Sequence, residues 1–167
     1  QREIQTMVDS GLPFGVNLPI RFLKDEAMLR FVCESGVRFV TTSAGSPAKF
    51  IAPLKAAGIV VYHAVPTVDA AMKCVDAGID GLVVEGAEGG GFKNPEEVST
   101  LVLLQAIRAR TDVPLVAAGG ICDGRGMAAA HHLASGLRGG VTKRILVVHG
   151  WGSRAEYLTD LALGIRE

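Results

Sequence analysis

The chain has 167 residues, of which 49% are hydrophobic and 20% charged, and its formal net charge is zero. This length supports one domain with a substantial core, and so apolar a composition excludes a disordered chain. The scattered charges give no indication of binding to nucleic acid or to a membrane surface, and no apolar segment approaches the roughly 20 residues of a membrane-spanning helix.

A pattern of short apolar strand, loop, amphipathic helix and glycine repeats along the chain. The predicted strands are residues 14–18, 37–41, 59–63, 79–84 and 114–118. A helix is predicted to end near residue 10, and others to begin at Asp25, Ser46–Pro47, Thr67, the capping box Asn94-Pro95-Glu96-Glu97, and Met127. This alternation predicts an α/β fold with a parallel sheet, either part of a barrel or a doubly wound open sheet.

Polar and glycine-rich segments follow the predicted strands, whereas the loops at the opposite ends are short. These segments are Asn17, residues 41–43, His63, residues 85–91 and Gly119-Gly120. Because parallel βα proteins bind ligands at the carboxyl ends of their strands, we expect the functional site there.

The segment Pro114 to Gly126 has the pattern of strand, double glycine and helix start. Without a Cβ atom, Gly119 and Gly120 allow their backbone N–H groups to approach an anion closely, and the positive end of the next helix would add to the attraction. The pattern therefore predicts a phosphate site. The alternative is that the two glycines only satisfy the geometry of a βα turn.

The three cysteines, Cys33, Cys74 and Cys122, are far apart and form no C-x-x-C pair. They predict reduced thiols in a cytoplasmic protein and no zinc site. Adjacent His131 and His132 would point to different faces of a helix, so no metal site is expected there. Because the sequence starts at Gln1 rather than at a methionine, we expect that it is cut at its front.

Four segments, found in this order, carry a family resemblance. They are Phe14-Gly15-Val16-Asn17-Leu18, Thr42-Ser43-Ala44-Gly45-Ser46-Pro47, residues 84–91 (VEGAEGGG) and residues 117–126 (AAGGICDGRG). Over residues 2–130 the chain resembles the nitronate monooxygenases, formerly called 2-nitropropane dioxygenases, and their relatives, the flavin-type enoyl-ACP reductases. The resemblance implies a partial (β/α)8 TIM barrel of about five consecutive βα units, with FMN lying over the strand ends.

The resemblance also assigns roles to residues. Asn17 would meet the flavin ring region, Gly119 and Gly120 would hold the FMN phosphate, and Ser43 and His63 would line the pocket. The cofactor-binding residues that it implies are Asn17, Ser43, Glu85, Gly89, Gly90, Gly119 and Gly120. Two of these assignments have plain structural alternatives: Asn17 as the cap of a strand end, and His63 as a strand-end histidine bonded to a backbone carbonyl.

A catalytic base is not evident. Phe92 stands about where the best-known nitronate monooxygenases have a histidine, and phenylalanine cannot accept a proton. His63 is a weak candidate from another strand. Glu85 or Glu88 could supply a carboxylate, although a solvated loop glutamate is the plainer interpretation. A substrate that arrives already as an anion would need no base.

The C-terminal part departs from the family pattern. We expect residues 1–140 to form an incomplete FMN-binding barrel domain and residues 141–167 a strand-loop-helix tail. In the tail, the strand 144–148 and the loop His149-Gly150-Trp151-Gly152-Ser153 resemble the start of an α/β-hydrolase. No G-x-S-x-G segment occurs, so hydrolase activity is not expected.

The expected function is FMN-dependent oxidation of an alkyl nitronate or nitroalkane by O2, giving a carbonyl compound and nitrite. One alternative is a flavin-type enoyl-thioester reductase. Another is an inactive truncated or chimeric fragment, because five strands cannot close a barrel.

Overall fold

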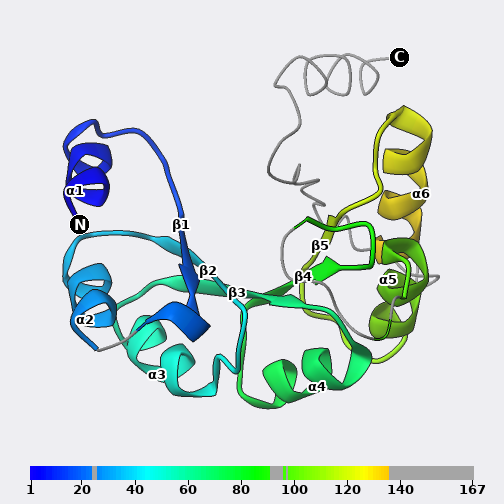
Figure 1. The fold of residues 1–167 in the computed structure, drawn as a ribbon, viewed down its shortest axis with the longest axis horizontal. Coiled ribbons are helices and arrows are strands. Elements are labelled where there is room, and N and C mark those ends of the chain that lie inside the picture. Colours follow the sequence, from blue (N-terminus) through cyan, green and yellow to red (C-terminus); the bar gives the residue numbers. More distant parts are fainter. Residues whose placement is uncertain (24–25, 91–95, 97, 136–167) are drawn as a thin grey trace. The chain divides into compact units, whose positions relative to one another are not determined.

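The computed structural model describes residues 1–23, 26–90, 96 and 98–135 (Figure 1). The described residues belong to two compact units. One contains Gln1–Ala64 with Cys74–Gly81, and the other contains Val65–Lys73 with the described residues from Leu82 onward. The predicted tail, 141–167, lies outside the described residues, as does the expected domain boundary at residue 140.

Strands and helices alternate along the described chain (Figure 1). The strands are β1 (Val16–Pro19), β2 (Phe39–Ser43), β3 (Val60–Val65), β4 (Gly81–Glu85) and β5 (Leu115–Ala118). The helices are α1 (Arg2–Asp9), the 3-10 turn η1 (Ile20–Phe22), α2 (Ala27–Glu34), α3 (Ala48–Ala56), α4 (Val68–Asp76), α5 (Thr100–Arg108) and α6 (Gly124–Ser135). The sheet has the strand order β1-β2-β3-β4-β5, with parallel pairing, which confirms the predicted run of five βα units.

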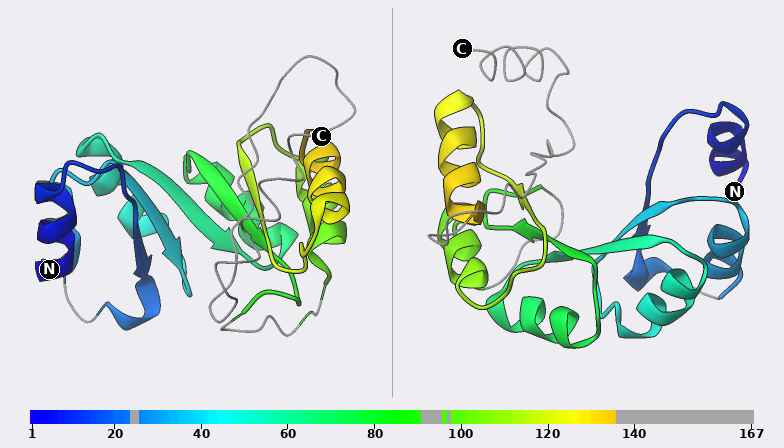
Figure 2. Two further views of the ribbon diagram at one scale, coloured as in Figure 1. Left: turned by 90° about the horizontal axis from the view of Figure 1, so that it is seen from above. Right: turned by 180° about the vertical axis from the view of Figure 1, so that it is seen from behind.

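In the first unit, β2 pairs with both β1 and β3, so that Asn17 lies beside Thr41, and Thr42 beside His63. Burial alternates along each strand because successive side chains point to opposite faces. Val40 and Val61 are fully buried on one face. Helices α2 and α3 lie side by side (Figures 1 and 2), and their buried side chains are Val32, Ile51 and Leu54.

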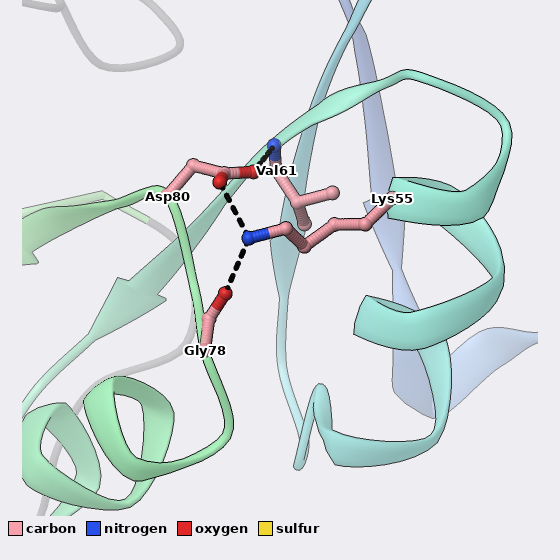
Figure 3. Close-up of polar contacts among 4 residues, drawn as sticks. All are labelled: Lys55, Val61, Gly78 and Asp80. Atoms are coloured by element: carbon pink, nitrogen blue, oxygen red, sulfur yellow. Dashed lines mark hydrogen bonds and ion pairs between the residues drawn. The ribbon is translucent and has the colours of Figure 1, made fainter.

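An ion pair joins α3 to the turn before β4 (Figure 3). The Lys55 ammonium donates to Asp80 Oδ1 at 2.7 Å and to the Gly78 carbonyl at 2.8 Å. Asp80 Oδ2 accepts the backbone N–H of Val61 at 2.9 Å, and the Asp80 N–H donates back to the Val61 carbonyl at 3.1 Å. These bonds lie at the amino ends of the strands, so they stabilise the fold on the side opposite the expected site.

In the second unit, β4 pairs with β5, which places Glu85 beside Ala118 at the carboxyl ends of the two strands. Helices α5 and α6 pack against each other and against β5 (Figures 1 and 2). The fully buried side chains here include Leu82, Val84, Leu104, Ile107 and Ala117.

Three predicted helix starts are wrong. Helix α6 begins at Gly124, three residues before the predicted Met127. Helix α5 begins at Thr100 with Ser99 as its N-cap, not at the predicted capping box, of which Asn94, Pro95 and Glu97 lie outside the described residues. The carboxylate of Glu88 takes the role of the cap, as described below. Helix α3 begins at Ala48 after Pro47, and no side chain caps it. The predicted cap at Thr67 is confirmed, since its Oγ1 accepts the Ala70 N–H at 3.1 Å.

The described residues contain neither a membrane-spanning helix nor a metal-binding cluster. No helix there is long and apolar enough to cross a membrane. Nor does any group of three or more His, Cys, Asp or Glu side chains in that part of the chain have a metal-binding arrangement.

Candidate functional site

A cluster of polar side chains lies at the carboxyl ends of β1 and β2. Asn17 Oδ1 accepts the hydroxyl of Thr41 at 3.1 Å and, with a longer contact of 3.4 Å, the hydroxyl of Ser43. The three side chains share one face of the sheet because they follow the two-residue alternation of paired strands. Asn17 is exposed and the two hydroxyl residues are half-buried. The cluster therefore presents an amide and two hydroxyl groups that can bind a polar ligand.

His63 lies on the other face of the sheet, away from Asn17 and Ser43. It is 4% exposed, and its Nδ1 is 2.7 Å from the hydroxyl of Thr42, which is itself fully buried. Burial lowers the pKa of His63 to about 4, although hydrogen bonds to the backbone at Gly45 and Thr42 act in the opposite direction. The imidazole is therefore neutral at pH 7. This placement favours the structural alternative, in which His63 lies at the end of its strand and hydrogen-bonds to the backbone. It does not favour a histidine that lines the pocket and acts as a base.

The backbone to which His63 hydrogen-bonds includes the turn after β2. Ala44 has φ of 55°, a conformation that costs a non-glycine residue on the order of 1–2 kcal/mol. The turn is also fixed from η1, because the Arg21 N–H donates to the Ala44 carbonyl at 3.1 Å. Ser43 precedes this turn, so its position depends on these contacts.

Three glycines come together in the second unit, and we call Gly89, Gly119 and Gly120 the glycine cluster. Gly119 has φ of +97°, and a Cβ atom there would lie 2.6 Å from the backbone N of Gly89. The loop after β5 therefore lies directly against the loop after β4. Among the described residues, none accepts a hydrogen bond from the N–H of Gly119 or Gly120. Unpaired backbone N–H groups are the donors that an anion needs. The side chain of Glu88 lies against Gly120, on the side where a Cβ would be.

Glu88 and Thr100 hold the glycine cluster in place. Glu88 Oε2 accepts the Thr100 N–H at 2.9 Å and lies 3.1 Å from its hydroxyl, so an exposed loop glutamate caps the start of α5. The same hydroxyl accepts the Gly86 N–H at 3.2 Å and lies 3.1 Å from the carbonyl of Ala118. Thr100, which is 1% exposed, thus links the ends of β4 and β5. Desolvation acts to raise the pKa of Glu88, but the hydrogen bonds from Thr100 outweigh it and lower the pKa.

The start of α6 is capped by the protein itself. Asp123 Oδ1 accepts the Gly126 N–H at 2.7 Å and therefore places a carboxylate at the positive end of the helix. The expected contribution of this helix end to anion binding is weakened, because a neighbouring carboxylate repels a second anion. The donors that remain are those of the glycine cluster.

Glu85 is the last residue of β4, on the face opposite the fully buried Leu82 and Val84. Its side chain is half-buried, and burial raises its pKa. A Cβ atom on Gly89 would lie 2.5 Å from Glu85 Oε1, so the carboxyl group lies directly against the glycine cluster. No hydrogen bond joins this carboxyl group to any residue that the structure describes.

Three residues remain: Gly90 and Phe92, which the sequence analysis singled out, and Thr100, which it did not. Gly90 is exposed, with open space where a Cβ would be, and Phe92 lies outside the described residues. The role of Thr100 was missed by the sequence analysis. The available signal was Ser99-Thr100 directly before the apolar residues 101–104, a pattern typical of a helix start.

The parallel βα units and the glycine cluster at the strand ends define an α/β protein of the barrel type with a candidate anion site. Comparison with family models gives a match to nitronate monooxygenase over residues 4–150. The chain belongs to the nitronate monooxygenase family, as its four ordered segments predicted.

Individual relatives agree with this assignment. The chain is 38% identical over 135 residues to the (3aS,4S,5R,7aS)-5-hydroxy-7a-methyl-1-oxo-octahydro-1H-indene-4-carboxyl-CoA dehydrogenase of Rhodococcus jostii, covering 81% of this chain and 36% of the relative. It is 35% identical to a nitronate monooxygenase of Pseudomonas aeruginosa, covering 73% and 39%. The solved structure of FabK from Thermotoga maritima superposes with a TM-score of 0.74 at 32% identity, over 87% of this chain and 46% of that one.

Two consequences concern the extent of the chain. It spans between a third and two fifths of the length of these two curated relatives. The predicted α/β-hydrolase resemblance of residues 143–167 has no support, since the family match continues to residue 150 and includes the predicted strand 144–148. A single strand followed by His-Gly is too short a pattern to identify a hydrolase without the nucleophile segment.

Proposed function

We propose that the protein carrying this sequence is an FMN-dependent oxidoreductase of the nitronate monooxygenase type. The observation that carries the proposal is the glycine cluster, in which the Gly119 and Gly120 N–H groups have no acceptor among the described residues. A phosphate group fits the backbone donors of this site because its oxygens accept hydrogen bonds. The side chains of Glu88, against Gly120, and of Glu85, against Gly89, border the site. Gly119 and Gly120 would hold the phosphate, and Thr100 and Glu88 would fix their position.

The other flavin contacts that we propose rest on the family resemblance. They are Asn17, Ser43, Glu85, Gly89 and Gly90. Asn17 can donate from its amide nitrogen because its Oδ1 is engaged by Thr41 and Ser43. A bound flavin would supply electron acceptance from the substrate and reoxidation by O2, while the protein supplies orientation and electrostatics.

The proposed reaction is oxidation of an alkyl nitronate with O2 to a carbonyl compound and nitrite. Membership of the family supports it, as does the 35% identity to the nitronate monooxygenase of Pseudomonas aeruginosa. We further propose that the protein acts in the cytoplasm, with a small molecule and O2 as its reaction partners.

A second candidate function is oxidoreduction of an acyl thioester, the class to which an enoyl-thioester reductase belongs. The observation that favours it is the 38% identity to a protein named as a carboxyl-CoA dehydrogenase, over 81% of this chain.

The two candidates are distinguished by assaying the flavin-loaded protein with two substrates. With propionate-3-nitronate, the first proposal predicts nitrite formation and O2 uptake. With acyl-CoA and enoyl-CoA thioesters, the second predicts flavin reduction by the former, or thioester-dependent NAD(P)H oxidation with the latter. Nitrite without thioester turnover supports the first function, the reverse result supports the second, and a flavin-loaded protein inert in every assay contradicts both.

A further inference from the structure

We infer that Glu85 is the catalytic base of the site, accepting a proton from a carbon acid whose acidic C–H lies next to a nitro group or a thioester carbonyl. The inference rests on the proposed function, since it assigns a proton-transfer role within the same flavin site. The substrate class that follows is common to both candidate functions. It is a compound with a carbon whose anion is stabilised by an adjacent electron-withdrawing group.

The position of Glu85 is the first argument. It ends β4 at the carboxyl edge of the sheet, where parallel βα proteins carry their catalytic side chains, and it lies beside Ala118, which directly precedes Gly119. Its carboxyl group lies against Gly89, so an alanine at residue 89 would collide with it. The carboxyl group is therefore adjacent to Gly89, which the family resemblance assigns to flavin binding.

The surroundings of Glu85 are the second argument. Its side chain is half-buried, and no described residue donates a hydrogen bond to it. A carboxylate that serves only the fold is normally paired or hydrogen-bonded when it is withdrawn from water. With no donor among the described residues, both oxygens of the Glu85 carboxylate are available for a proton, and burial raises its pKa towards the range of a useful base.

The other candidates have different roles in the structure. Glu88 Oε2 accepts the Thr100 N–H at 2.9 Å and lies 3.1 Å from the Thr100 hydroxyl, and the pKa of Glu88 is lowered. His63 is buried on the face of β2 and β3 opposite Thr41 and Ser43, and its Nδ1 lies 2.7 Å from the Thr42 hydroxyl. Phe92 has no group that accepts a proton. Glu85 is the remaining candidate from the sequence analysis that combines a proton-accepting group with a place at the site.

The proton-transfer step conserves atoms and charge. A Glu85 carboxylate oxygen forms an O–H bond as the substrate C–H bond breaks. The electron pair of that bond moves into the nitro group, giving a nitronate, or into the thioester carbonyl, giving an enolate. No oxidant takes part in this step; the later two-electron oxidation needs the flavin of the proposed function.

The test compares Glu85→Gln with the wild type in the flavin-loaded protein, using a neutral nitroalkane and the nitronate made from it in advance. General base catalysis contributes about 10²–10⁴-fold, so kcat/KM for the nitroalkane should fall by at least about 100-fold. The nitronate has already lost its proton, so a loss of flavin contact at residue 85 lowers kcat/KM for both substrates together. The ratio of kcat/KM for nitroalkane to that for nitronate should still fall by at least about 100-fold. Glu34→Gln, an exposed change on α2, should leave both values unchanged.

A second measurement needs no turnover and serves the thioester class. The wild type should catalyse uptake of solvent deuterium at the α carbon of an acyl-CoA thioester, followed by NMR, and Glu85→Gln should lose this exchange while keeping the bound-flavin spectrum. The inference is supported if Glu85→Gln loses nitroalkane turnover relative to nitronate turnover, or loses deuterium exchange at the thioester. The substrate on which the loss occurs identifies the substrate class.

The inference is overturned if Glu85→Gln turns over nitroalkane and exchanges thioester protons at wild-type rates, or if it loses nitronate and nitroalkane activity equally. It is also overturned if the wild type oxidises nitronate but neither accepts nitroalkane nor exchanges the thioester. That result leaves the proposed function standing. A flavin-loaded wild type inert towards all three compounds would instead remove the proposed function, and the inference with it.

Discussion

Replacement of Gly119 by alanine is expected to lower the free energy of unfolding by about 2–5 kcal/mol and to weaken FMN binding at least tenfold. Two effects contribute to the instability. A φ of +97° is strained for any residue with a Cβ atom, at about 1–2 kcal/mol. The new Cβ would also lie 2.6 Å from Gly89 N and 2.9 Å from Gly89 Cα, and relieving such overpacking costs about 1–3 kcal/mol.

The loss of affinity has a separate cause. The atoms in collision belong to backbone, so the loops after β4 and β5 must move apart rather than rotate a side chain away. That movement shifts the Gly119 and Gly120 N–H groups from the positions at which they would bind phosphate. A lost hydrogen bond to a charged group is worth about 1.5–3 kcal/mol, which corresponds to a tenfold to hundredfold change in affinity.

The matched control is Gly124→Ala, at the start of α6. Gly124 has open space where a Cβ would be and no positive φ, so this variant should be as stable as the wild type or slightly more stable. Urea unfolding measures the stability, and flavin fluorescence titration measures the affinity. Equal behaviour of the two alanine variants would show that the close approach of Gly89 and Gly119 has no importance in solution.

The protein is expected to lose about 2 kcal/mol of stability between pH 7 and pH 5 through His63 alone. Its pKa is about 4 in the folded chain, against an ordinary value of 6.5 when unfolded. Between these values the unfolded chain binds more protons. The contribution of His63 is therefore complete above pH 6.5 and is lost as the pH falls towards 4. A buried imidazolium next to the Thr42 hydroxyl is the species that the fold disfavours.

Urea unfolding at pH 7 and pH 5 checks this prediction. His63→Gln keeps an amide donor and acceptor but cannot be protonated, so its stability should change by about 2 kcal/mol less than that of the wild type over this interval. His131→Gln removes an exposed histidine on α6 and should leave the pH dependence of the wild type unchanged. An unchanged pH dependence in His63→Gln would mean that His63 is accessible to protons in the folded state.

The alternation of strands and helices could be predicted from the sequence because each element carries its own local signal. Apolar runs marked the five strands to within a few residues, and Gly36, Gly58 and Gly78 marked helix ends, where all three have positive φ. The start of α5 was not predicted, although Ser99-Thr100 before the apolar residues 101–104 is typical of a helix start. Its cap comes from Glu88, twelve residues before Thr100, and could not be predicted. A side chain that reaches back from a preceding loop leaves no pattern at the helix start itself.

The candidate site was predictable in its glycines but less so in its side chains. Gly119-Gly120 follows an apolar strand, so its position at the sheet edge follows from the local pattern. The face to which His63 points depends on the register of β3 against β2, and a shift of one residue would reverse it. The contact between Glu85 and Gly89 depends on how the loop folds back over the strand, which no spacing rule gives.

The central claim, that the glycine cluster binds the phosphate of FMN, is tested most directly by comparing FMN with riboflavin. The two ligands share the ring and the ribityl chain and differ only in the phosphate. In the protein that carries this sequence, the dissociation constant for FMN should be at least about tenfold lower than that for riboflavin, and Gly119→Ala should abolish the difference. Equal affinity for the two ligands in the wild type, or no binding of either, would contradict the claim.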